Sequence, residues 1–218
     1  MTTQTLSAPI YQGQFGEFTI NQSDRTSVII YRAGLMVAAL SFAIGSALVL
    51  FYNTPQTIAA LTPLYLCFSL ALGVSLLTIH IYMVALHRLL QIVWAIGSIS
   101  ALVLALSTSQ PLAITVYNQP LTLLFGIGFT FVALTGIFFK EAFCFNRLET
   151  KALTAIVPVL LLGHLVGILQ PAWERVLLAA WAILLIVFAV RKVFQAIPPD
   201  IGDKSVFAHL KAQAQTKH

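Results

Sequence analysis

The stretch "VIIYRAGLMVAALSFAIGSALVLF", residues Val28 to Phe51, contains a single charged side chain, Arg32. The hydrocarbon core of a bilayer is about 30 Å thick, and an α-helix needs roughly 20 apolar residues to cross it. The stretch is therefore long enough and apolar enough to span a membrane. Arg32 lies one helical turn inside this predicted span, and we interpret it as an anchor whose long side chain reaches the polar interface.

The composition of the whole chain also indicates a membrane protein. Of its 218 residues, 59% are hydrophobic and only 9% are charged, whereas soluble domains carry about 25% charged residues. So few charges cannot cover a water-soluble surface, and the chain is expected to lie in a lipid bilayer. We therefore relate the net charge of +5 to membrane topology and lipid contact, and we expect no nucleic-acid partner.

Five further stretches resemble the first in length and hydrophobicity. The predicted fold is an all-α membrane protein, a bundle of six transmembrane helices. We expect the spans at about residues 28–51, 64–86, 90–107, 121–139, 152–169 and 173–190. They form a transmembrane domain, 27–192, between a polar N-terminal arm, 1–26, and a polar C-terminal tail, 193–218. The arm lacks the pattern of a secretory signal peptide, and its composition predicts no fold.

Basic residues are divided unequally between the two sides of this bundle. Eleven Lys and Arg residues fall on one side, and only Arg175 falls on the other. Loops rich in Lys and Arg stay on the cytoplasmic side of a membrane. Both termini are therefore predicted to face the cytoplasmic or stromal side.

His80 and His164 are the ionisable side chains predicted to lie deepest in the membrane, in the second and fifth spans. A neutral imidazole can bind the metal of haem or chlorophyll, and the two rings are expected at similar depths. They are therefore the candidate cofactor-binding residues. The alternative is that each histidine only hydrogen-bonds a neighbouring helix, and that the protein holds no cofactor. The sequence offers no set of metal ligands, so no metal site is predicted.

The histidines also suggest a second function. Three spans followed by three spans would give halves of opposite orientation, each with a histidine in its middle span, as in the inverted repeats of transporters. A small-solute transporter or channel would line a water-filled path with the polar residues of these spans: Ser69, Ser75, Thr78, His80 and His164. However, no Asp or Glu lies in the middle of any span, and the lack of a buried carboxylate argues against an ion-coupled carrier.

The segment "IFFKEAFCFNRLETK", Ile137 to Lys151, joins the fourth span to the densest charge cluster in the middle of the chain. It contains neither Gly nor Pro, so the helix is expected to continue past the bilayer surface to Phe145 or Asn146. Exposed aromatic patches mark interaction sites. We predict partner-binding residues here, with a membrane protein complex as the partner: Lys140, Glu141, Phe143, Phe145 and Arg147.

Two other interpretations of this segment stay open. Its rings could lie among lipid headgroups, with the basic side chains at the phosphates. Alternatively, Cys144 and Glu141 could form a reactive centre, because neighbouring cations lower the pKa of a cysteine, but no histidine is placed to act as its base. The chain lacks the signatures of hydrolases, nucleotide-binding enzymes and metalloproteases, so we predict no catalytic residues and no enzymatic activity.

The part "FFKEAFCFNRLE", Phe138 to Glu149, resembles the signature of an uncharacterised integral-membrane family of cyanobacteria and plastids. The polar N-terminal arm and the proline-terminated last span are similar too. The resemblance implies a multi-pass protein in a photosynthetic setting, in the thylakoid or the plasma membrane, and it carries no catalytic residues. The sequence therefore predicts a non-catalytic accessory or assembly factor of a membrane complex.

Overall fold

The computed structural model describes residues 9–52 and 54–215, in which a short hairpin precedes a series of helices and one π-helical turn, η1. In chain order the elements are β1 (Ile10–Gly13), β2 (Gly16–Thr19), α1 (Gln22–Phe51), α2 (Pro55–Thr78), α3 (Val84–Ser107), α4 (Leu112–Asn118), α5 (Pro120–Thr122), η1 (Leu123–Ile127), α6 (Gly128–Phe145), α7 (Leu148–Leu165), α8 (Pro171–Phe194), α9 (Pro198–Ile201) and α10 (Ser205–Gln215). Within this described part, six segments are long and apolar enough to cross a membrane: α1, α2, α3, the continuous run from α5 to α6, α7 and α8. The predicted six-helix bundle is confirmed.

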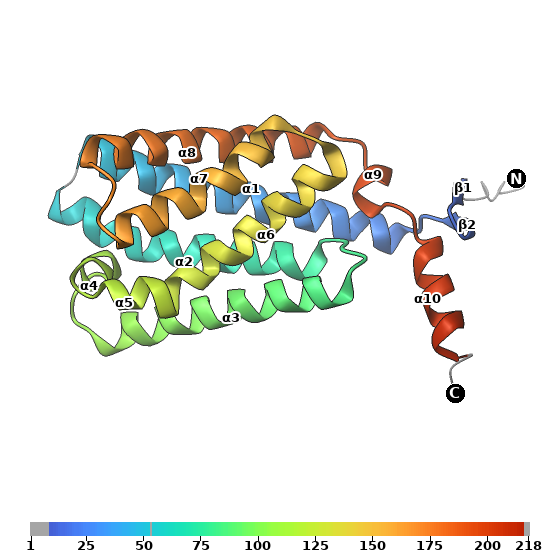
Figure 1. Cartoon of the computed structure of the whole chain (residues 1–218), viewed down its shortest axis with the longest axis horizontal. Coiled ribbons are helices and arrows are strands. Elements are labelled where there is room, and N and C mark those ends of the chain that lie inside the picture. Colours follow the sequence, from blue (N-terminus) through green and yellow to red (C-terminus); the bar gives the residue numbers. More distant parts are fainter. Residues whose placement is uncertain (1–8, 53, 216–218) are drawn as a thin grey trace, which may run out of the picture.

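The long helices form a closed ring in the order of the sequence. Each packs against the helix before and after it, from α1 through α2, α3, α6, α7 and α8, and α8 returns to α1. In Figure 1 the helices lie along the long axis of the molecule. The hairpin, α9 and α10 lie together at one end, which we call the basic end, and α4 lies at the opposite end, which we call the far end. Which side of a membrane the basic end faces stays a prediction.

Close helix packing and interhelical hydrogen bonds hold the ring together, as expected where lipid replaces water as the solvent. A Cβ at Gly34 would lie only 2.7 Å from the carbonyl oxygen of Ala71, so the small residue allows α1 and α2 to approach. Ser75 donates a 3.0 Å hydrogen bond to the carbonyl oxygen of Tyr31 across the same contact. Leucines and phenylalanines from all six segments fill the interior: Leu35, Leu72, Leu134, Leu153 and Phe188 are 0% exposed, and Leu90 is 4% exposed.

The turn between α2 and α3 lies at residues 79–83, several residues before the predicted end of the second span at 86. The hydropathy pattern predicted the wrong position for this turn, because the turn contains the apolar residues Ile79 and Ile81. Their side chains are 4% and 8% exposed. Both belong to the hydrophobic core of the bundle, so they are buried by protein, and the neighbouring Tyr82 contacts the C-terminal segment. The Tyr82 hydroxyl donates a 2.5 Å hydrogen bond to the carbonyl oxygen of Ile201, and the Tyr82 ring contacts that of Phe207.

The N-terminal arm, for which the composition predicted no fold, is ordered from Ile10 as a hairpin that joins the C-terminal segment. The Asp203 carboxylate accepts hydrogen bonds from the backbone N–H of Gln14 at 2.6 Å and of Ser205 at 2.9 Å. Lys204 forms a 2.7 Å ion pair with Asp24 in the first turn of α1. The two ends of the chain therefore form one cap over the basic end of the bundle.

The fourth span contains the π-helical turn and continues as a helix beyond the predicted span. A Cβ at Gly128 would overlap the carbonyl oxygen of Leu123, so the glycine makes room for the wider turn of η1. At the other end α6 reaches Phe145, as predicted, and Asn146 ends it in the left-handed conformation with φ of 51°. This extension carries Glu141 into the interior of the basic end.

Candidate functional site

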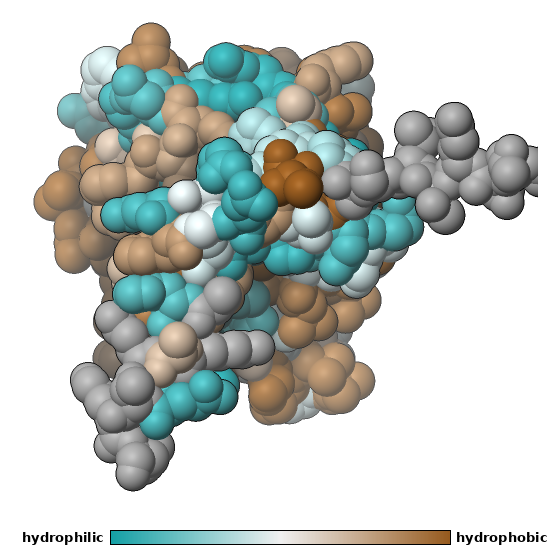
Figure 2. Space-filling model, turned by 90° about the vertical axis from the view of Figure 1, so that its right-hand side faces the viewer, coloured by the Kyte–Doolittle hydropathy of each residue, from teal (hydrophilic) through white to brown (hydrophobic). Residues whose placement is uncertain are grey.

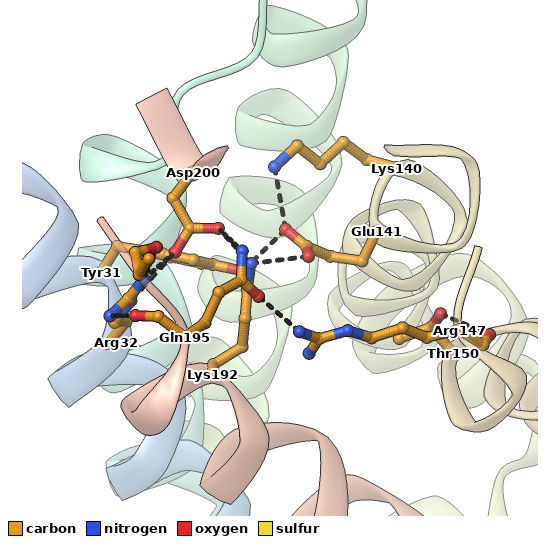
Figure 3. A network of polar contacts seen from close by, with 10 residues as sticks. Tyr31, Arg32, Lys140, Glu141, Arg147, Thr150, Lys192, Gln195 and Asp200 are labelled. Carbon is orange, nitrogen blue, oxygen red and sulfur yellow. Dashed lines mark hydrogen bonds and ion pairs between the residues drawn. The ribbon is translucent and has the colours of Figure 1, made fainter. Parts of the chain in front are cut away.

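Lys192, in the last turn of α8, lies at the centre of a network of buried charged side chains (Figure 3). Its Nζ lies 2.7 Å from Oε2 of Glu141 on α6, and it also contacts the carboxylate of Asp200 on α9. Lys192 and Glu141 are 0% exposed, and Asp200 is 4% exposed. The Phe145 ring covers the ammonium, with its centroid 4.3 Å from Nζ, which is a favourable cation–π geometry.

Asp200 connects this centre to α1 through Arg32. The guanidinium donates to Oδ2 of Asp200 from Nε at 2.9 Å and from Nη2 at 2.6 Å. Its Nη1 donates to the carbonyl oxygen of Gln195 at 2.6 Å, so it also holds the chain that leaves α8. The Gln195 amide donates a 3.0 Å hydrogen bond to Oδ1 of the same carboxylate. Asp200 therefore fixes the short helix α9 against α1 and α8.

Glu141 connects the centre to its own helix and to α1. Its Oε1 lies 2.8 Å from Nζ of Lys140, and the Tyr31 hydroxyl donates to the same oxygen at 3.3 Å. Each carboxylate of the centre thus lies between two cations. We refer below to the ion network, which comprises Tyr31, Arg32, Lys140, Glu141, Arg147, Lys192, Gln195 and Asp200.

The start of α7 joins the network through Arg147. Its Nη2 donates a 2.7 Å hydrogen bond to Oε1 of Gln195, and its carbonyl oxygen accepts from Thr150 at 3.0 Å. Nearby, Glu149 is 7% exposed and its Oε2 accepts a 2.9 Å hydrogen bond from Arg191. The charged residues around the α6–α7 turn therefore point largely into the protein.

The chemistry of the ion network suits a structural role. Removing a charge from water costs several kcal/mol, and close pairing offsets that cost only when the geometry is good. Here pairing holds four separate elements, α1, α6, α8 and α9, in one arrangement. Buried pairs of this kind add little net stability but penalise any arrangement that separates them. The network therefore gives the basic end a defined shape.

One expectation from the sequence is wrong here. Arg32 is not an anchor that reaches the membrane interface, because its side chain is buried against Asp200. Buried carboxylates near the ends of the spans were not predicted from the sequence, yet Glu141, Glu149 and Asp200 are all buried. Glu141 and Asp200 lie beyond the predicted span ends, and the returning C-terminal segment covers that region. The sequence did contain a signal for these buried carboxylates. Arg32 and Lys192 lie next to apolar stretches, and a cation in apolar surroundings needs an anionic partner.

The structure divides the predicted partner-binding residues into two groups. Lys140, Glu141 and Arg147 belong to the ion network, and Phe145 packs over its centre, within 5.6 Å of Lys140 Nζ and 5.5 Å of the Arg147 guanidinium carbon. Phe143 faces outward and is 75% exposed. Phe143 is therefore accessible to a partner protein. Glu141 is not accessible, and it could affect binding only by fixing the arrangement of the helices at the basic end. Cys144, beside Phe143, is exposed as well.

The two predicted cofactor histidines lie at opposite ends of the bundle. His80 lies in the α2–α3 turn at the basic end, where its Nδ1 is buried without a hydrogen-bond partner in the described structure. Burial lowers the pKa of His80, with Lys140 and Lys204 adding to the effect and Asp24 opposing it. His164 lies at the far end, and its Nδ1 is 2.7 Å from Glu174. The expectation of similar depth is wrong, and the pair does not fit one haem or chlorophyll between them. Cofactor binding by either alone stays a prediction.

Three of the five polar residues expected to line a transport path form hydrogen bonds within the bundle, and two of these bonds join different helices. Ser69 shares a 2.6 Å hydrogen bond with Ser98 of α3, and Ser75 bonds Tyr31 as described. Thr78 donates to a carbonyl of its own helix, that of Val74, at 2.8 Å. Transport through a polar path stays a prediction. Among residues 9–52 and 54–215, no three His, Cys, Asp or Glu side chains lie close enough to hold a metal ion.

One comparison with known proteins finds a match. The model of a family described as "Uncharacterized integral membrane protein (DUF2301)" matches residues 74–209. The matched region begins near the end of α2 and ends in α10, so it includes the ion network except for Tyr31 and Arg32. No curated protein and no solved structure matches the chain.

Proposed function

The chain belongs to the family of uncharacterized integral membrane proteins (DUF2301), and we propose that it is a non-catalytic accessory or assembly factor of a membrane protein complex. The main support for this proposal is the difference in exposure between the charged and the aromatic side chains at the basic end. The charged side chains of the ion network pair with one another inside the protein, whereas the Phe143 ring, on the same helix as Glu141, is 75% exposed. An aromatic side chain presented from a fixed base is suited to binding another protein.

Phe143 is part of a small exposed apolar surface. The Phe139 ring, one turn earlier, is 47% exposed and its centroid lies 4.6 Å from that of Phe143. Leu148, the first residue of α7, is 79% exposed. We call Phe139, Phe143 and Leu148 the aromatic edge. Ring pairs of this kind present a large area for little loss of side-chain entropy, which favours binding.

Charges around the aromatic edge indicate the chemistry of the partner. Arg88, in the second turn of α3, and Lys151, one turn after Leu148, are exposed. Figure 2 shows the basic end with hydrophilic residues over much of its surface and hydrophobic residues along its margins. We therefore propose a partner that offers an apolar groove beside acidic side chains, at the level where the bundle leaves the bilayer.

The experiment compares native assemblies of variants. The double change Phe139→Ala and Phe143→Ala should reduce the native size of the complex that is extracted in a mild detergent, because it removes both rings and leaves the ion network intact. Phe125→Ala is the matched control, since Phe125 is 68% exposed but lies on η1, away from the basic end. An assembly of unchanged size in the double variant would contradict the proposal, as would equal loss in the control.

We place the protein in a photosynthetic membrane, on the resemblance of the segment Phe138 to Glu149 alone. Immunoblots of separated thylakoid and plasma membranes check this location. The alternative functions, small-solute transport and haem or chlorophyll binding, remain predictions without a specific structural observation in their favour. A purified protein that absorbs visible light would support pigment binding in place of the accessory role.

A further inference from the structure

A pocket of about 410 Å³ lies in the half of the bundle toward the far end, away from the ion network. One wall is a stripe of α1 with the spacing of a single helix face, formed by Phe42, Gly45, Ser46 and Val49. The aromatic rings of Tyr65, Phe68 and Phe131 complete the interior, together with η1. Its volume lies within the range of about 300 to 1,000 Å³ that is typical of small-molecule sites.

Two serine hydroxyl groups distinguish this pocket from ordinary packing defects. Ser41 and Ser46 both line it and are only 6% and 5% exposed. Neither hydroxyl has a hydrogen-bond partner within residues 9–52 and 54–215, although serines in helices commonly bond a carbonyl of their own chain. These two groups are therefore free to bond a ligand in the pocket.

A second groove in the same bundle serves as a comparison. It has a volume of about 430 Å³ and lies between α3, α6 and α7. Its polar residues, Thr135 and Thr154, both donate to carbonyl groups of their own helices, at 2.8 Å each. Its walls therefore offer no free hydroxyl group from these residues, and acyl chains of the bilayer are sufficient to fill it.

The remaining walls of the far-end pocket define the polarity of its ligand. The short helix α4 covers it with Leu112, Ala113 and Val116, and the Leu112 N–H is held by the Thr62 hydroxyl at 3.0 Å. The residues that line the pocket include no Asp, Glu, Lys or Arg, and the one histidine among them, His164, is already paired with Glu174. An ionised ligand group would be buried without a counter-charge, which is unfavourable. The chemistry of the pocket therefore suits an uncharged ligand.

We propose that the far-end pocket binds a neutral, lipid-soluble small molecule whose apolar body carries a hydroxyl or carbonyl oxygen. The apolar body occupies the space between α1, α4 and η1, and the oxygen bonds the hydroxyl group of Ser46, which lies on the pocket stripe of α1. The π-helical turn η1 contributes Leu123 and Ile127 to the wall, and such turns are frequent at functional sites. This site is separate from the aromatic edge, and the proposal holds whether or not the accessory role is correct.

The test uses the full-length protein in lipid nanodiscs and a long-chain alcohol that carries a photoactivatable diazirine. After irradiation, peptide mass spectrometry should find the label on the pocket stripe of α1 and on α4. Unlabelled alcohol should compete for it. The Ser46→Ala variant should bind about fivefold more weakly, the change expected for one lost hydrogen bond. The Ser46→Leu variant, which fills the pocket, should lose the label at α4.

Controls separate this site from nonspecific contact with lipid. Ala113→Leu fills the pocket from α4 and should abolish labelling on α1, even if Ser46→Leu fails to fold. Thr135→Leu in the second groove should leave labelling unchanged. Labelling concentrated on the lipid-facing Leu70 and Leu77, 69% and 65% exposed, would overturn the proposal. So would equal labelling of the pocket by a photoactivatable phosphatidylcholine, because that result assigns the space to ordinary acyl chains.

Discussion

Lys192 Nζ and Glu141 Oε2 lie 2.7 Å apart between α8 and α6, and neither side chain is exposed. The two residues are 51 positions apart in the sequence and belong to helices that both end at the basic end. Their contact, together with Asp200 and Arg32, joins the membrane bundle to the C-terminal segment. We therefore expect changes in this network to affect the stability of the basic end.

Lys192→Met should destabilise the protein strongly, because it leaves Glu141 and Asp200 buried with one cation fewer. Breaking a buried ion pair from one side costs about 3 to 5 kcal/mol. The double variant Glu141→Gln with Lys192→Met should recover part of this loss, since it removes charges of both signs. Thermal unfolding in detergent measures both. Equal melting temperatures for the wild type and Lys192→Met would show that the pair is not a structural element.

Asp200→Asn should release α9 and the segment after it, because Arg32 and Lys192 lose their shared carboxylate. We expect faster tryptic cleavage at Lys204, which follows α9 in the sequence. Glu17→Gln, a change at an exposed hairpin carboxyl group, is the control and should be cleaved at the wild-type rate. If Asp200→Asn were cleaved no faster than this control, Asp200 would not hold the segment in place.

The contact between the hairpin and α10 should weaken in acid. The hydrogen bonds from Ser205 and from the Gln14 N–H hold the pKa of Asp203 below its ordinary value of 3.8. A lowered pKa in the folded state means that the contact is fully stabilised above 3.8 and is lost as the pH falls through the lower value. The protection of the Gln14 N–H against hydrogen exchange, relative to an unstructured peptide at the same pH, should fall in that range. In Asp203→Asn, exchange should be fast and lack this acid transition; an unchanged transition would assign it to another group.

Cys144 provides a test of the predicted topology. It is exposed at the end of α6, whereas Cys67 lies in the middle of α2. A membrane-impermeant maleimide should label Cys144 only from the cytoplasmic or stromal side, and Cys144→Ser should remove the label. In the Cys144→Ser background, Gln110→Cys, between α3 and α4, should be labelled only from the other side. Labelling of Cys144 from the side opposite to that predicted would overturn the orientation inferred from the basic residues.

Much of the fold follows from the sequence, because long apolar runs are local signals. The continuation of α6 to Phe145 was predictable for the same reason, since the stretch from Ile137 to Phe145 contains no Gly or Pro. The position of the α2–α3 turn was not predictable, because Ile79 and Ile81 pack into the hydrophobic core and their apolar side chains extend the hydropathy pattern of α2. Hydropathy cannot distinguish burial by lipid from burial by protein.

The candidate site was only partly predictable for a related reason. The sequence drew attention to Lys140, Glu141, Phe143, Phe145 and Arg147, but it did not indicate which of them point inward. That division depends on Lys192 and Asp200, which reach the same place only after α8 returns to α1. The free hydroxyl groups of Ser41 and Ser46 were missed altogether, because serine is common in membrane helices and its partners are set by packing.

The most direct test of the proposed function replaces Phe143 with a photoreactive phenylalanine analogue in native membranes. We expect a crosslink at position 143 to one protein, the same one that is lost from the native complex of the Phe139→Ala and Phe143→Ala variant. The analogue at position 125 should crosslink to lipid alone. Crosslinks only to lipid at position 143 would rule out a protein partner at the aromatic edge and would assign this surface to the membrane interface.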